Sequence, residues 1–72
     1  MLKVSDLIET CNSDVYFKIY DQKGKKHAEG DYKDLSKAYI KIDKNFHKSV
    51  CDYIVEDFWI LDDYLNIHIF VE

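Results

Sequence analysis

The C-terminal end of the chain carries a two-residue alternation that limits what it can fold into. One face of residues 64–71 consists of Leu65, Ile67, Ile69 and Val71, and the other of Tyr64, Asn66, His68 and Phe70. Such alternation is typical of a β-strand with one buried face. A second strand-forming run covers residues 53–61, and Asp62-Asp63 between the runs has the residue types of a tight turn. The sequence therefore predicts a β-hairpin centred on Asp62-Asp63.

The N-terminal half predicts a short helix followed by another hairpin. Val4, Leu7, Ile8 and Cys11 have the spacing of one buried helical face, and Ser5 is its expected N-cap. Residues 14–20 alternate as a half-buried strand, with Val15, Phe17 and Ile19 on one side and Tyr16, Lys18 and Tyr20 on the other. A weaker strand is expected over residues 26–29, after a turn containing Gly24.

A second helix is expected after Gly30, with Asp31 or Asp34 as its cap. Its apolar positions have helical spacing: Leu35, Ala38, Tyr39, Ile42 and Phe46. Residues 43–52 have two interpretations, an extension of this helix or an irregular bridge. The order α-β-β-α-β-β predicts one α+β domain over residues 1–72, a small, mainly antiparallel four-stranded sheet with two helices packed on one face.

The residues that carry catalysis or bind metals are scattered. The three histidines His27, His47 and His68 lack metal-ligand spacing, and neither Cys11 nor Cys51 belongs to a CxxC motif. The acidic turn does not match a calcium-binding loop, and two glycines cannot form a phosphate-binding loop. We therefore expect a non-enzymatic protein without a cofactor or bound metal.

The chain has no apolar stretch near the roughly 20 residues needed to span a bilayer, and its first residues lack a signal-peptide core. We therefore expect a cytoplasmic protein with no membrane partner. In that compartment both cysteines should be reduced, partly buried thiols.

Charge is distributed unevenly along the chain. All basic residues are lysines, the net charge is −4, and no lysine follows Lys48. The segment after Lys48 carries six acidic residues: Asp52, Glu56, Asp57, Asp62, Asp63 and Glu72. A lysine stripe on the second helix and beyond could touch phosphates: Lys33, Lys37, Lys41, Lys44 and Lys48. Because the chain is acidic and lacks arginine, direct nucleic-acid binding is kept only as an alternative.

The C-terminal hairpin has more apolar residues than one sheet face can bury. Residues 58–61, Phe-Trp-Ile-Leu, are consecutive, so a strand must send them to both faces. Either residues 43–52 fold over the second face, or this face binds a partner. The expected partner is a protein with a basic surface, although the acidic residues could instead serve solubility. The candidate partner-binding residues are Glu56, Asp57, Trp59, Asp62, Asp63, Tyr64, His68 and Phe70.

Four segments together resemble a known group of proteins: residues 2–9 (LKVSDLIE), residues 15–21 (VYFKIYD) followed by Gly24, Gly30 with Asp34-Leu35, and residues 58–67 (FWILDDYLNI). They resemble short uncharacterised phage and prophage accessory proteins of low-GC Gram-positive bacteria, from which residues 43–52 depart as a longer bridge.

This resemblance implies that the gene lies among the accessory genes of phages and mobile elements. Such genes include those for anti-CRISPR and other anti-defence proteins. It implies a protein-binding inhibitor of a bacterial defence complex, such as a nucleic-acid-binding nuclease. The alternatives are a homodimeric structural or regulatory module of a phage or mobile element, and a lysine-mediated nucleic-acid binder.

Overall fold

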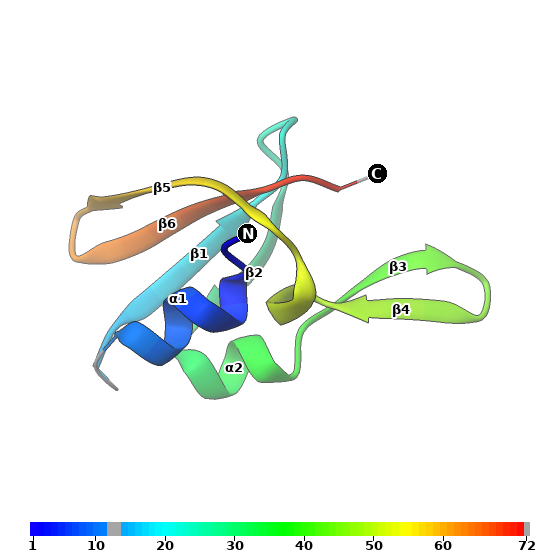
Figure 1. Cartoon of the computed structure of the whole chain (residues 1–72), viewed down its shortest axis with the longest axis horizontal. Helices are drawn as coiled ribbons and strands as arrows, with labels where there is room; N and C mark the ends of the chain where they lie inside the picture. Colours follow the sequence, from blue (N-terminus) through cyan, green and yellow to red (C-terminus); the bar gives the residue numbers. More distant parts are fainter. Residues whose placement is uncertain (12–13, 72) are drawn as a thin grey trace.

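The computed structural model describes residues 1–11 and 14–71, which form a four-stranded sheet, a separate two-stranded hairpin and two short α-helices (Figure 1). Glu72, one of the six acidic residues after Lys48, lies outside the described residues. The elements in chain order are α1 (Val4–Thr10), β1 (Tyr16–Tyr20), β2 (Lys26–Gly30), α2 (Tyr32–Ser36), β3 (Tyr39–Asp43), β4 (Phe46–Ser49), the 3₁₀ helix η1 (Val50–Asp52), β5 (Val55–Leu61) and β6 (Tyr64–Ile69).

The four-stranded sheet has the strand order β2-β1-β6-β5. Its outer pairs are antiparallel, whereas the central pair β1–β6 is parallel. The prediction of an α+β fold with a mainly antiparallel sheet and two helices is confirmed, and both helices lie on one face of the sheet (Figure 1). The sheet is nevertheless mixed, and the described residues contain six strands, two more than predicted.

The core lies between the helices and the two central strands. Phe17 and Ile19 of β1 and Ile67 and Ile69 of β6 are each at most 1% exposed, and Leu35 of α2 is fully buried against them. The alternation predicted for both strands is therefore confirmed, because every second side chain is buried.

The C-terminal hairpin is closed by the predicted two-residue turn. Leu61 pairs with Tyr64, and Asp62 and Asp63 between them have φ angles of 54° and 67°. Two successive positive φ angles define the turn that matches the right-handed twist of a hairpin. Asp tolerates this conformation better than most residues, although Gly and Asn are the usual choices.

The start of α1 differs from the prediction, because Ser5 lies inside the helix and is not its cap. Lys3 is extended, forms a bridge with Ile54 and takes the cap position, so the helix begins at Val4, two residues earlier than a Ser5 cap would place its start. The Asp6 carboxylate accepts a hydrogen bond from the Lys3 N–H at 2.9 Å. At α2, the predicted Asp31 cap is confirmed, since its carboxylate accepts hydrogen bonds from the Lys33 and Asp34 N–H groups.

Residues 39–49 form an antiparallel hairpin that projects from the body of the protein, and we call it the arm (Figure 1). The predicted helix through Tyr39, Ile42 and Phe46 is wrong, and neither interpretation of residues 43–52 was correct. The helix ends at Ser36, and the Asp43 carboxylate accepts a hydrogen bond from the Asn45 N–H in the tip of the arm. This local bond favours a turn over a helix.

Candidate functional site

The candidate site is the sheet face that points away from the helices, which we call the outer face. The strand register places on it Tyr16, Lys18 and Tyr20 of β1, Tyr64, Asn66 and His68 of β6, and Asp57, Trp59 and Leu61 of β5. Most of these side chains are at least partly exposed, but Asn66 is buried and donates a hydrogen bond to the Tyr64 carbonyl. The face thus has a fixed polar centre among aromatic side chains.

An aromatic row crosses three strands of the outer face, with His68 at its centre. The His68 ring lies 4.6 Å from the Trp59 ring and 6.2 Å from the Tyr20 ring, both in edge-to-face geometry. Its Nδ1 atom is 3.1 Å from the Asp57 Oδ1 atom, on the edge strand β5. Edge-to-face packing holds such rings in place, so this row offers a partner a preformed surface.

A second aromatic pair lies towards the other end of the same face. Tyr16 and Tyr64 are neighbours in the parallel register, with ring centroids 5.4 Å apart. The ammonium group of Lys18 lies 4.2 Å from the centroid of the Tyr64 ring. This cation–π contact places one positive charge on a face whose β5 edge is acidic.

The structure brings together four of the eight predicted partner-binding residues on the outer face: Asp57, Trp59, Tyr64 and His68. Asp62 and Asp63 are exposed at the tip of the hairpin. Glu56 and Phe70 line a hollow at the opposite end of the hairpin, beside Met1 and Lys48. The eight residues therefore occupy three separate places along the hairpin.

The three β1 residues Tyr16, Lys18 and Tyr20 were not among the predicted site residues. Part of this result could be predicted from the sequence, because the alternation in residues 14–20 already placed these three side chains on one side of their strand. The part that could not be predicted is the parallel pairing of β1 with β6, which joins strands far apart in the chain. The residue pattern of a single strand does not show which other strand will pair with it.

The outer face remains uncovered in the described part of the chain. The alternative in which residues 43–52 fold over it is wrong, because the arm projects away from the four-stranded sheet (Figure 1). Trp59 is 36% exposed, and the side chain of His68 is 37% exposed.

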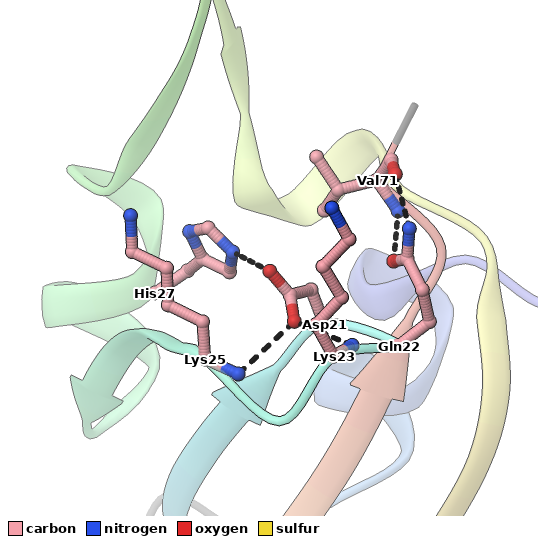
Figure 2. Close-up of polar contacts among 6 residues, drawn as sticks. All are labelled: Asp21, Gln22, Lys23, Lys25, His27 and Val71. Carbon is pink, nitrogen blue, oxygen red and sulfur yellow. Dashed lines mark hydrogen bonds and ion pairs between the residues drawn. The ribbon is translucent and has the colours of Figure 1, made fainter.

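A buried carboxylate fixes the turn between β1 and β2, directly after Tyr20. Asp21 accepts hydrogen bonds from the Lys23 and Lys25 N–H groups at 2.8 and 3.0 Å, and its other oxygen lies 2.8 Å from His27 Nε2 (Figure 2). The hydrogen bond to His27, helped by those from the two N–H groups, lowers the pKa of Asp21 to about 2. Asp21 therefore stays ionised and supports this end of the face.

The side chain of Gln22 ties the same turn to the end of the chain. Its Nε2 donates to the Val71 carbonyl at 2.6 Å, and its Oε1 accepts from the Val71 N–H at 2.9 Å (Figure 2). These two hydrogen bonds resemble the backbone pairing of neighbouring strands, and they lie just beyond the C-terminal end of β6.

The predicted lysine stripe on a single helix face is wrong. Lys33 belongs to α2, Lys37 follows it, and Lys41, Lys44 and Lys48 belong to the arm. The ammonium group of Lys48 lies 4.4 Å from the centroid of the Tyr53 ring. These lysines therefore form no continuous basic ridge along a helix.

Residues 1–11 and 14–71 contain no group of three or more His, Cys, Asp or Glu side chains placed to hold a metal ion. Cys11 and Cys51 are free and partly buried, as predicted, and burial raises the pKa of Cys51. No helix in this part of the chain is long and apolar enough to cross a membrane.

Comparisons with protein-family models, curated proteins and solved structures found no match for this chain.

Proposed function

We propose that this chain is a non-enzymatic, cytoplasmic protein-binding module that docks on a basic surface through its outer face. The observation that carries the proposal is the exposed aromatic row Tyr20–His68–Trp59, flanked by Asp57. Tyr and Trp are common anchors of protein interfaces, since they bury large areas with little loss of side-chain freedom.

The negative charge of the C-terminal hairpin supports the proposal that the partner has a basic surface. The hairpin from Val55 to Ile69 contains four carboxylates and no lysine: Glu56, Asp57, Asp62 and Asp63. All four are exposed, so their field extends into solvent and accelerates encounters with a positive surface. The aromatic row with Asp57 at its edge resembles the apolar core and polar rim of ordinary interfaces.

The proposed target is a nucleic-acid-binding protein of a bacterial defence complex, such as a CRISPR nuclease. This part rests on the resemblance to phage and prophage accessory proteins and on the fit between an acidic hairpin and a groove that binds phosphates. Occupying such a groove would block nucleic-acid binding without any catalytic step.

The test is capture of proteins from the lysate of a CRISPR-bearing bacterium by the immobilised chain. The captured nuclease complex is then assayed for DNA binding with increasing amounts of the free chain. We expect capture to weaken as salt is raised, and DNA binding to fall as the chain is added.

Trp59→Ser should reduce capture at least tenfold, and Asp57→Lys should reduce it most at low salt. The matched control is Tyr32→Ser on α2, which removes an aromatic side chain of similar exposure from the helical side. Equal capture by the Trp59 and Tyr32 variants would contradict docking through the outer face.

A further inference from the structure

Two exposed apolar surfaces lie outside the outer face, at opposite ends of the molecule. The first is the face of the arm formed by Ile42 and Phe46, which are 47% and 53% exposed. The second, which we call the inner strip, is formed by Phe58 and Ile60 of β5, which are 49% and 78% exposed. Exposed apolar pairs of this size on so small a chain suggest that something covers them.

The inner strip lies on the helical side of the sheet but beyond the helices. Phe58 pairs with Ile67 and Ile60 with Leu65, so both point to the side that is buried in the central strands. Beside Ile60 is a hollow of about 330 Å³, lined by Cys11, Asp14, Val15, Ile60, Asp63, Tyr64 and Leu65. This hollow is largely apolar, with two carboxylates among its lining residues.

The arm carries the opposite charge. Residues 39–49 contain three lysines (Lys41, Lys44 and Lys48) and one acidic residue, Asp43, giving a net charge of +2. Lys44 is in the turn at the tip, two residues before Phe46. The arm thus combines an exposed ring with a nearby ammonium group, and the hollow combines an apolar wall with carboxylates.

We propose that two copies of this chain associate about a twofold axis, with the arm of each copy packed on the inner strip of the other. Ile42 and Phe46 would cover Phe58 and Ile60, and Lys44 would lie near the carboxylates of the hollow. This inference goes beyond the proposed function, because it uses the arm and the opposite side of the sheet.

The shape of the molecule favours a second copy over an intramolecular contact. The arm and the tip of the β5–β6 hairpin lie at opposite ends of the long axis, which measures 35 Å (Figure 1). One chain therefore cannot place its arm on its own inner strip. Two chains side by side in opposite directions can make both contacts at once, which closes the assembly as a dimer.

A twofold pair must bury enough surface to be stable. A stable interface buries about 800 Å² per partner, roughly one sixth of the 5051 Å² accessible surface of this chain. Because the contact occurs twice, each copy contributes both an arm and an inner strip. Each copy has a net charge of −4, so the positive arm must face the acidic hairpin for the two copies to approach.

The test is sedimentation equilibrium at low micromolar concentration. We expect the native chain to sediment with twice the mass of one chain, and Phe46→Ser and Ile60→Ser each to raise the dimer dissociation constant at least tenfold. The control is Tyr39→Ser, since Tyr39 is 58% exposed on the opposite face of the arm. Circular dichroism verifies that each variant is folded.

Charge reversal distinguishes the arm contact from other dimers. Lys44→Asp and Asp14→Lys should each weaken the dimer at low salt, whereas a mixture of the two variants should associate. In that mixture one contact is native and the other has both charges reversed.

A monomeric native chain would overturn the proposal. So would a dimer that survives Phe46→Ser, which would favour pairing of β5 edges. The outer face is unchanged in all these variants, so capture of a basic partner tests the proposed function separately.

Discussion

The Asp62-Asp63 turn gives a quantitative test of how the hairpin is held. Asp63 has a φ angle of 67°, in the left-handed region that disfavours residues with a Cβ atom by roughly 1–2 kcal/mol. Asp63→Gly removes this strain, but the added freedom of Gly in the unfolded chain returns about 0.4–1 kcal/mol. We expect a net gain of about 0.5–1 kcal/mol in the free energy of unfolding.

Two further variants separate strain from charge. Asp63→Ala keeps the left-handed strain and loses the side chain that tolerates it, so we expect a loss of about 0.5–1 kcal/mol. Asp63→Asn should be nearly neutral, because Asn adopts this conformation as readily as Asp does. All three variants remove the same negative charge.

The assay is urea unfolding followed by the fluorescence of Trp59, the single tryptophan, which belongs to the same hairpin. Thermal unfolding by circular dichroism should agree, with a shift of roughly 4–8 °C per kcal/mol. If Ala and Gly stabilised the protein equally, the reasoning from backbone strain would be refuted. Repulsion between the adjacent carboxylates would then be the dominant effect.

Two other predictions concern the β1–β2 hairpin. The pKa of Asp21 is lowered from 3.8 to about 2 in the folded protein, chiefly by the hydrogen bond to His27. Its contribution to stability is therefore complete above pH 4 and is lost as the pH falls towards 2. Urea unfolding between pH 5 and pH 2 should show this loss in the native chain and a flatter profile, with lower stability at pH 5, in Asp21→Asn. Gly30→Ala should destabilise the protein by more than about 1 kcal/mol, because φ is 142° and the added Cβ would lie 2.5 Å from the Asp34 Cβ. Full retention of stability in thermal unfolding would contradict this prediction.

The elements predicted correctly are those whose pattern is local and strong. Alternation in β1 and β6, the Asp62-Asp63 turn and the Asp31 cap are each set by a few neighbouring residues. The arm was missed because apolar residues at positions 35, 38, 39, 42 and 46 also fit a helical period. The better signal was Asp43-Lys44-Asn45, a turn sequence between two short runs of β-forming residues.

The composition of the candidate site was harder to predict than the strands. Alternation placed His68 on the outward side of its strand, but only the pairing of strands brings Tyr20 and Trp59 beside it. The division of the hairpin into an outer face and an inner strip also depends on which neighbours the helices cover. That coverage is a property of the assembled sheet and cannot be derived from one strand.

The four consecutive apolar residues 58–61 gain a physical explanation when the two sides of β5 are considered separately. Trp59 and Leu61 belong to the outer face, whereas Phe58 and Ile60 form the inner strip. A dimer joined through the inner strips would leave both outer faces free, so one particle would present two copies of the aromatic row. Against a target with two basic sites, the second contact would form at a high effective concentration. A small chain with one modest face would then bind more tightly than its area alone allows.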